Sequence, residues 1–362
     1  YGFELLMWGD MFFRLAGGDY FTNFNQDPEL GEIPEKIKQL VPENVQLVYW
    51  DYFSREQQRY EKNIDAHNAI KSESWFAGGL WTWAGFAPHN AFAIATMREA
   101  MRACRAKGVE NVVMTMWGDN GAECSKFAVL PALFMVAQMA RGIDDEETIH
   151  ANFEKEFGIP FEDFRALDLA GTQNDSAEAI YNPEKYLLYC DPFMGQFDNR
   201  VKPADAAGYA NCAARLAVYA DHAEYGYLFR SLRALCAFLS VKADLGIRTR
   251  AAYLSGDKKA AKALCTDYDA ALERLDAFYA AYEQQWMHEN KPQGFDVVDL
   301  RIGGQRQRLL HCRDRLLAYA EGRLDRIEEL EEPVLDCCCE EKADGQATRA
   351  IFWHEIASAN VI

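Results

Sequence analysis

Short apolar runs that alternate with helical patterns constrain the fold of this chain more than any other feature. Runs typical of β-strands lie at residues 3–8, 45–50, 76–83 and 111–117, and helical patterns separate them. Short strands that alternate with helices predict βαβ units and a parallel sheet. Because the runs are almost continuously apolar, we expect their strands to be buried on both faces.

The segments between these runs carry helix signals of differing strength. A short helix is predicted at 34–42, an amphipathic helix at 55–72, a helix closed by Gly108 at 91–108, and an apolar helix at 127–140. Four βα units are half of an eight-stranded β/α barrel, and a small open sheet is the alternative. We therefore predict an α/β fold, the latter half of a TIM-type barrel, over residues 1–142.

From residue 143 onward the strand signals become rare and helix-forming residues dominate. Gly256 and Asp257 have the character of a C-cap and an N-cap between two of the helical patterns. We expect an all-α domain over 143–362, in which only the last segment, 351–362, has strand character. The long helical patterns lie at 204–253, 257–288 and 302–331.

Composition excludes several classes of partner. The 362 residues carry a formal net charge of −18, which argues against nucleic acid and anionic membrane surfaces as partners. The apolar run 127–140 is shorter than the roughly 20 residues that span a bilayer. The first residue is Tyr1, and we expect the chain to be a piece of a longer protein.

The ten cysteines indicate a reducing compartment. They have irregular spacing and form no CxxC pair, which favours reduced thiols in a cytoplasmic protein. Cys337, Cys338 and Cys339 are consecutive, and neighbouring side chains of an extended segment point in opposite directions. We therefore predict no metal site and no cofactor.

Tryptophans mark the ends of the predicted strands. The four strand-end residues are Trp8, Trp50, Trp83 and Trp117. The carboxylates that follow within two residues of three of them are Asp10, Asp51 and Asp119. A single such Trp is usually a core residue and a single such Asp usually caps a helix. Four coincidences at the active-site end of a barrel indicate a sugar pocket with aromatic walls and carboxylate acceptors.

Three of these strand-end segments resemble a known family. They are "VQLVYWDYF", "GGLWTWAGF" and "VVMTMWGDNGAE", and "WMHENKPQGFDVVDLRIGG" at 286–304 also resembles the family's bacterial branch. The chain is similar to the latter part of glycoside hydrolase family 20, the exo-acting β-N-acetylhexosaminidases. The resemblance implies the second half of the catalytic barrel followed by a helical domain.

The resemblance also implies a reaction. In this family the substrate's own 2-acetamido oxygen attacks the anomeric carbon and forms an oxazolinium intermediate, with retention of configuration. An Asp-Glu pair after the fourth barrel strand orients the acetamido group and supplies the general acid. Residues 3–8 resemble the fifth strand, so the pair is expected upstream of Tyr1 and the isolated chain is expected to be inactive.

Two further family motifs match residues of the first two strands. The family's Tyr-x-Asp matches Tyr49 and Asp51. The match implies that Tyr49 acts in catalysis by donating its phenolic hydrogen to the acetamido carbonyl, and that Asp51 accepts from a sugar hydroxyl. Trp8 matches a tryptophan that walls the acetamido methyl group.

The last two strands supply the remainder of the implied pocket. The family's Trp-x-Glu matches Trp117 and Asp119, with Asp in place of Glu. Trp117 would lie under the sugar ring and Asp119 would bind its 4- or 6-hydroxyl. Either Trp81 or Trp83 should supply another wall, and alternation along a strand places both on one face, so sequence does not choose between them.

Residues 286–304 are predicted to form a polar loop between two helices. The functional hypothesis is that Trp286, Glu289 and Arg301 cap the pocket, within one chain or across a homodimer interface. The alternative is a solvated loop with weak surface ion pairs.

Two other hypotheses stay open for the whole chain. One is a non-catalytic carbohydrate-binding or scaffold module that never had the acid pair, and the other is an open α/β domain with unrelated chemistry. The expected partners are an oligosaccharide with a terminal N-acetylhexosamine and the missing half of the barrel, because a half-barrel has two unpaired edges.

Overall fold

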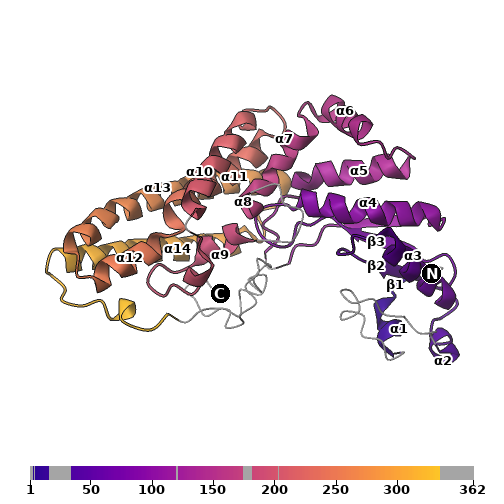
Figure 1. The fold of residues 1–362 in the computed structure, drawn as a ribbon, viewed down its shortest axis with the longest axis horizontal. Helices are drawn as coiled ribbons and strands as arrows, with labels where there is room; N and C mark the ends of the chain where they lie inside the picture. The colour runs from indigo at the N-terminus through magenta and orange to yellow at the C-terminus, as the bar shows by residue number, and fades with distance from the viewer. Residues whose placement is uncertain are drawn as a thin grey trace. The chain divides into compact units, whose positions relative to one another are not determined.

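The computed structural model describes residues 3, 5–15, 34–119, 121–173, 182–202 and 204–334. The chain divides into two compact units, which are described separately (Figure 1). Unit 1 consists of Tyr1–Trp81, Asn90–Met116 and Val129–Asp163. Unit 2 consists of Thr82–His89, Trp117–Ala128 and Phe164–Ile362.

Unit 1 contains a parallel sheet. Its strands are β1 (Leu5–Trp8), β2 (Val45–Trp50), β3 (Trp75–Gly79) and β4 (Val112–Thr115). They lie in the order β1-β2-β3-β4, and every neighbouring pair is parallel. The register pairs Trp8 with Val48 and Trp50 with Ala77, so the carboxyl ends of the strands share one edge of the sheet. The predicted α/β class with a parallel sheet is confirmed.

Helices connect and cover these strands. They are α1 (Asp10–Leu15), α2 (Glu35–Lys38), α3 (Gln57–Ile70), α4 (Asn90–Ala106), α5 (Leu130–Ala140) and α6 (Glu146–Phe157). Helix α3 packs on β2, α4 packs on β3, and α3, α4, α5 and α6 pack each on the next. Gly108 follows α4 with a φ of +67°, in agreement with its predicted capping role.

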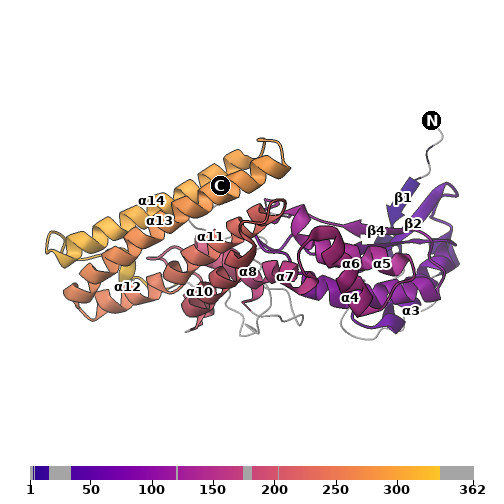
Figure 2. The same ribbon diagram turned by 90° about the horizontal axis from the view of Figure 1, so that it is seen from above.

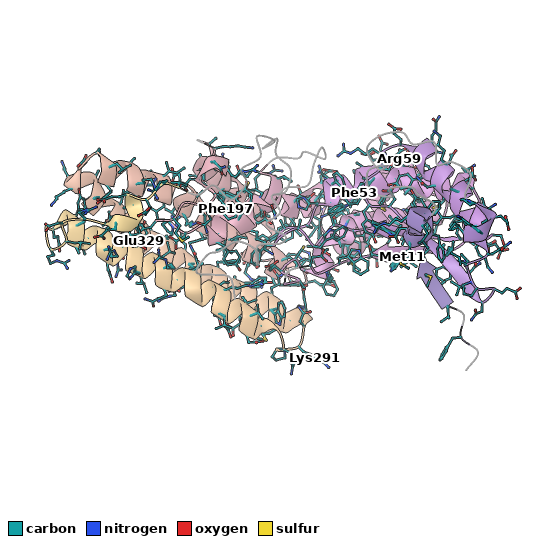
Figure 3. All side chains as sticks on the ribbon, turned by 90° about the horizontal axis from the view of Figure 1, so that it is seen from below. Met11, Phe53, Arg59, Phe197, Lys291 and Glu329 are labelled. Carbon is teal, nitrogen blue, oxygen red and sulfur yellow. The ribbon has the colours of Figure 1, made fainter. Side chains whose placement is uncertain are left out.

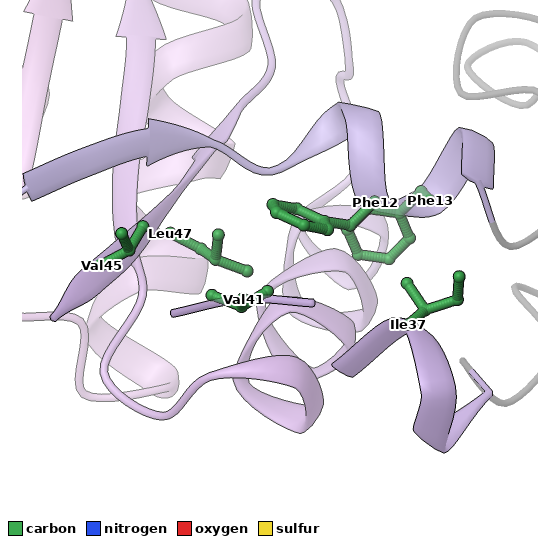
Figure 4. Close-up of a cluster of buried hydrophobic side chains, with 6 residues drawn as sticks. All are labelled: Phe12, Phe13, Ile37, Val41, Val45 and Leu47. Carbon is green, nitrogen blue, oxygen red and sulfur yellow. The ribbon is translucent and has the colours of Figure 1, made fainter. Parts of the chain in front are cut away.

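A small apolar core joins β2 to α1 and α2. Figure 4 shows its side chains, which are Phe12, Phe13, Ile37, Val41, Val45 and Leu47. Trp50, Ala66 and Ile70 pack against this cluster. The cluster explains why a segment as short as α2 is helical, because Ile37 buries its side chain there and is only 5% exposed.

Burial differs between the middle and the outer strands. In β3, a Cβ at Gly78 would overlap the Met97 and Met114 side-chain ends, so a larger residue there would require both methionines to move. The outer strand β1 is different, because Leu5 and Leu6 are each 48% exposed. In β4 no residue is buried, whereas most residues of β2 and β3 are, so burial on both faces was predicted correctly for β2 and β3 and wrongly for β1 and β4.

Unit 2 is helical. Its helices are α8 (Leu169–Thr172), α9 (Pro183–Tyr189), α10 (Asp205–Leu216), α11 (Gly226–Lys242), α12 (Leu245–Leu254), α13 (Lys258–Glu289) and α14 (Phe295–Ala320), and α7 (Phe161–Arg165) bridges the boundary with unit 1. Helices α10, α11, α13 and α14 pack in succession, and α13 and α14 lie side by side in Figures 1 and 2. Asp257 caps α13 by accepting a hydrogen bond from the Ala260 backbone N–H, as predicted.

Three helix predictions in unit 2 were wrong, and one of them is the helix at 302–331, because α14 begins at Phe295 and ends at Ala320. Residues 286–304 are not a loop, because α13 continues to Glu289 and α14 begins at Phe295. Only five residues connect the two helices, and Figure 3 labels one of them, Lys291, at the end of this hairpin. The pattern at 204–253 is also divided, into α10, α11 and α12.

Two sequence predictions lie outside the described residues: the triple cysteine at 337–339 and the strand-like segment 351–362. The seven cysteines that are described are buried and form no disulfide with one another. No helix in the described part of the chain combines the length and the apolar character needed to cross a bilayer.

Candidate functional site

The strand-end tryptophans do not all lie where the sequence predicts. Trp8 and Trp50 are the last residues of β1 and β2. Strand β4 ends at Thr115, two residues before Trp117, and β3 ends at Gly79. Trp81 and Trp83 therefore belong to the segment after β3, and the alternation argument that placed them on one strand face was wrong.

The predicted pair Tyr49 and Asp51 is in direct contact. The Tyr49 hydroxyl donates a hydrogen bond of 3.0 Å to Asp51 Oδ2, and both residues are buried. Asp51 Oδ1 accepts from the backbone N–H groups of Phe53 (2.9 Å) and Ser54 (3.1 Å). Burial raises the pKa of Asp51, and these hydrogen bonds oppose the rise. Asp51 thus holds the turn that follows β2.

The Tyr49 ring lies on the face of the sheet that α3 covers. Its centroid is 4.8 Å from that of His67 and 6.4 Å from that of Tyr60, both on α3. Strand alternation places the neighbouring Trp50 on the other face, where its indole N–H donates to Asp10 Oδ1 at 3.3 Å. In the structure, Tyr49 therefore contacts Asp51 and α3, and its contact with a sugar remains a prediction.

An aromatic cluster in unit 1 was missed by the sequence analysis. Phe53 is 43% exposed and packs edge-on against Trp81, with ring centroids 5.2 Å apart. The Trp81 indole N–H donates to the Tyr52 carbonyl at 3.1 Å, and Trp81 also packs edge-on against Phe92. The signal was the run "WDYF" after β2, of which only the Trp and the Asp were interpreted.

Unit 2 holds Trp83, Trp117 and Asp119 on two segments, 82–89 and 117–128, which we call the β3 loop and the β4 loop. Trp117 is 41% exposed, and its carbonyl accepts hydrogen bonds from Thr82 Oγ1 (2.8 Å) and Lys126 Nζ (2.6 Å). Lys126 Nζ also donates to Thr82 Oγ1 at 3.0 Å. The two loops are therefore joined at the residue that was predicted to underlie the sugar.

The charge environment of Lys126 connects it to Asp119. Burial lowers the pKa of Lys126, and the negative charges of Asp119 and Glu289 oppose that effect. The Asp119 side chain is exposed, as a sugar ligand needs to be. Trp83 differs from Asp119, because it is only 8% exposed.

A buried ion pair that the sequence analysis missed anchors the β4 loop. Glu123 is 4% exposed and accepts from Lys185 Nζ at 2.8 Å. Its second oxygen lies 3.5 Å from an Arg301 nitrogen, and its carbonyl accepts from the Tyr282 hydroxyl at 2.9 Å. Buried charges need such partners, since an unpaired charge away from water is costly.

Two of the three predicted capping residues reach the β4 loop. Arg301 contacts it through Glu123, and Glu289 Oε1 accepts from Ser125 Oγ at 2.5 Å. Burial raises the pKa of Glu289, and hydrogen bonds from Ser125 and Tyr227 oppose the rise. Glu289 and Arg301 therefore hold the segment that carries Trp117 and Asp119.

The third capping residue has a packing role. Trp286 is 9% exposed, its indole N–H donates to the Lys291 carbonyl at 2.9 Å, and its ring packs against Phe295. These contacts close the short connection between α13 and α14.

The predicted site residues are thus divided between the two units. Trp8, Tyr49, Asp51 and Trp81 lie in unit 1, and Trp83, Trp117 and Asp119 lie in unit 2. Among the described residues, no group of three or more His, Cys, Asp or Glu side chains is placed to hold a metal ion.

Comparison with protein families identifies a match to the helical part of the chain. A protein-family model described as the Glycoside Hydrolase 20C C-terminal domain matches residues 160–349, which is more than half of the chain. No curated protein matches the chain.

Proposed function

Because this chain belongs to glycoside hydrolase family 20, through its Glycoside Hydrolase 20C C-terminal domain, we propose that it is part of a retaining exo-β-N-acetylglucosaminidase or hexosaminidase. The observation that carries the proposal is the family match over residues 160–349. Membership supports a glycosidase, and the substrate, a terminal N-acetylhexosamine, is our inference from the strand-end residues.

The proposed reaction uses the substrate's own acetamido group. Its carbonyl oxygen forms a bond to the anomeric carbon while the glycosidic C–O bond breaks, and a general acid protonates the departing oxygen. Water then opens the oxazolinium ring, so two inversions give net retention. We assign the acid and the residue that orients the acetamido group to an Asp-Glu pair upstream of this chain.

We assign sugar binding to residues that follow the strands. Trp117 and Trp8 would pack against the pyranose and the acetamido methyl, and their exposures of 41% and 39% leave area for such contacts. Asp119 would accept from the 4- or 6-hydroxyl. Trp81 and Trp83 are 5% and 8% exposed, so either would act mainly as a wall behind other side chains.

Tyr49 and Asp51 have a narrower role in the proposal. For Tyr49 to donate to the acetamido oxygen, its hydroxyl must leave Asp51, which now accepts its hydrogen. The burial of both residues favours a second contribution, in which Tyr49 and Asp51 hold the turn after β2. The two contributions predict different results for Tyr49→Phe. Loss of a direct contact would weaken the binding of N-acetylglucosamine more than that of glucose, whereas loss of the turn would weaken the binding of both sugars.

We further propose that β1 to β4 are strands five to eight of a β/α barrel, with residues 1–142 as its second half and 143–362 as the helical domain. Two observations support this proposal: the four strands are parallel and follow one another in sequence order, and the side chains of β1 are exposed. In a complete barrel, β1 would pair with a further strand and its side chains would be covered. We place the protein in the cytoplasm because its described cysteines are buried and not paired with one another.

Hydrolysis by the full-length protein tests the proposal. We expect it to cleave an aryl N-acetyl-β-glucosaminide and not the aryl β-glucoside, which lacks the acetamido nucleophile, and to release the β-anomer first. Trp117→Ala should lower kcat/KM by about tenfold to a hundredfold. Phe127→Ala is the matched control, because Phe127 is also an exposed aromatic of the β4 loop (45%) and has no assigned role. Binding of N-acetylglucosamine without any hydrolysis would instead support the non-catalytic module.

A further inference from the structure

Three residues at the start of α9, Asn182, Glu184 and Lys185, combine polarity with near-complete burial. Asn182 and Glu184 are 0% exposed and Lys185 is 1% exposed. Glutamate and lysine are almost never fully buried unless they have partners. The partners of this segment, which we call the α9 turn, lie on the β3 and β4 loops.

Asn182 and Glu184 hold the β3 loop. Glu184 Oε1 accepts from the backbone N–H groups of Phe86 (3.0 Å) and Ala87 (3.3 Å), and Asn182 Nδ2 donates to the Ala84 carbonyl at 3.0 Å. The fit is close, because a Cβ at Gly85 would lie only 2.2 Å from Glu184 Oε1. The backbone that follows Trp83 is therefore fixed by side chains of α9.

Phe86 anchors the same loop to the helices. Its ring packs edge-on against Phe278 and Tyr282 of α13, with centroids 5.5 Å and 5.3 Å away. The β3 loop is thus held by polar contacts from α9 and by aromatic contacts from α13.

Lys185 holds the β4 loop. Its ammonium group donates to Glu123 at 2.8 Å, with both side chains buried. Neighbouring residues of one helical turn thus each hold a different loop, Glu184 the loop with Trp83 and Lys185 the loop with Trp117. The loops are also joined to each other where Thr82 and Lys126 donate to the Trp117 carbonyl.

The protonation state of Glu184 affects this arrangement. Burial raises the pKa of Glu184 to about 8, and Oε2 has no hydrogen-bond partner among the described residues. The hydrogen bonds from the Ala87 and Phe86 backbone N–H groups and the positive charge of Lys185 oppose this rise in the pKa, and Lys185 also donates a hydrogen bond to Glu123. The other titratable groups near Glu184 are His89, Cys124, Tyr186, Tyr209 and Cys236. Because burial outweighs the hydrogen bonds and the charge of Lys185, Glu184 accepts from the β3 loop as a neutral acid below that pKa. Above it Glu184 is a buried anion, and ionisation favours conformations in which its carboxylate leaves the loop and reaches water.

We propose that Glu184 and Lys185 are positioning residues of the sugar site, which set the β3 and β4 loops and thereby the affinity for N-acetylhexosamine without touching the sugar. This inference rests on the proposed function. It has two consequences. Loss of either side chain weakens sugar binding through its own loop, and binding weakens as pH rises through the pKa of Glu184.

The experiment uses the full-length protein, N-acetylglucosamine as the titrant, and two pH values that bracket the pKa of Glu184. We expect wild type to bind more weakly at the higher pH. Glu184→Gln keeps an acceptor for Phe86 and Ala87 and cannot ionise, so it should bind as wild type at the lower pH and lose the pH dependence. Lys185→Met should weaken binding about tenfold at both pH values.

Hydrogen exchange supplies a readout that does not depend on sugar binding. Glu184→Ala should speed amide exchange mainly in residues 82–89, and Lys185→Met mainly in 117–128. Asp257→Ala is the control, because Asp257 caps the first turn of α13, far along the helix from the Phe278 and Tyr282 contacts, and its loss costs about 1 kcal/mol at that end of the helix. It should leave exchange in both loops near that of wild type.

The possible results are distinct. A wild-type protein that binds N-acetylglucosamine equally at both pH values, with Glu184→Gln and Lys185→Met variants that bind as tightly as wild type, would overturn the inference and leave the proposed function standing. A wild-type protein that does not bind N-acetylglucosamine would overturn the proposed function, even where exchange in the loops still follows the variants. Faster exchange throughout unit 2 in Glu184→Ala, as in a general loss of stability, would also overturn the positioning role.

Discussion

Tyr49 and Asp51 illustrate how a buried carboxylate depends on its donors. Asp51 has three hydrogen-bond donors, and Tyr49→Phe removes one while the charge stays buried. We expect the variant to lose about 1–2 kcal/mol of unfolding free energy, measured by urea denaturation. Tyr279→Phe is the control, because its hydroxyl donates to the exposed Asp299. Equal losses in the two variants would contradict the claim that burial makes the Asp51 contact costly to remove.

His67 predicts how unit 1 responds to acid. Its ring is fully buried between Phe13 and Tyr49, and burial lowers its pKa from 6.5 to about 4. The unfolded chain therefore binds a proton at a pH where the folded chain does not. The stability that the neutral ring contributes is present above pH 6.5 and is lost as the pH falls towards 4.

Denaturation of wild type and His67→Gln across this pH range tests that prediction. The wild-type protein should lose up to about 1.4 kcal/mol per pH unit more than the variant between these pKa values. Parallel stability curves for the two proteins would show that His67 does not titrate in this way. Glu184 in unit 2 has the opposite sign, since its pKa is raised and its contribution is lost as pH rises from about 4.5 through about 8.

At the level of single residues, the sequence predicted where a residue lies in a strand or helix better than it predicted which residue it contacts. Trp8 and Trp50 were correctly predicted as strand-end residues, and Asp257 as an N-cap, because each prediction uses only local pattern. The pair Glu123 and Lys185 was not predicted. Its members are 62 residues apart, and nothing in either neighbourhood shows that both charges are buried.

At the level of strands and helices, the local sequence pattern predicted the limits of an element correctly where the whole element is buried. The limits of β2 were predicted correctly at 45–50, because every residue of that strand is buried or half-buried. The helix hairpin at 286–304 was missed, since Pro292, Gly294 and the many charges indicate a loop. Helix α14 nevertheless begins at Phe295, where tertiary packing of Phe295, Val298 and Ile302 overrides the local polarity.

Replacement of two glycines by alanine, one just before α14 and one inside it, should change the stability of the protein in opposite directions. Gly294 has a φ of +96°, and a Cβ there would lie 3.3 Å from the Trp286 ring, so Gly294→Ala should cost about 1–2 kcal/mol. Gly303 lies inside α14 with nothing near its Cβ position, so Gly303→Ala should gain about 0.5–1 kcal/mol. Thermal denaturation of both variants tests this, and a stabilised Gly294→Ala protein would show that the hairpin is not held as described.

On the scale of the whole molecule, the outer strand β1 exposes apolar side chains that a stable soluble fold would normally cover. Leu5 and Leu6 are half exposed, and β1 is the first strand in the order β1-β2-β3-β4, so apolar side chains and unpaired backbone groups together favour association with other chains. We expect the 362-residue chain alone to associate increasingly with concentration, as measured by light scattering. Leu6→Lys should reduce this association, and Leu300→Lys, at a residue of unit 2 that is 53% exposed, should not. A chain that stays monomeric at every concentration would argue against a half-barrel with uncovered edges.

Sequence could not decide between half a barrel and a small open sheet, and the reason is physical. Four parallel strands in sequential order occur in both, because the local βαβ unit is the same and only the partners of the outer strands differ. Most helices of unit 2 were easier to predict than the sheet topology, since α10, α11, α13 and α14 are long and their sequences favour helix without reference to a partner.

The most direct test of the account is a calorimetric titration of the full-length protein with N-acetylglucosamine and with glucose. We predict that N-acetylglucosamine binds at least about tenfold more tightly, and that Asp119→Ala weakens the binding of both sugars. If Tyr49 contacts the acetamido group, Tyr49→Phe should reduce the difference between the two sugars. Equal affinity for the two sugars, or no binding of either, would contradict the claim that this chain contributes to an N-acetylhexosamine site.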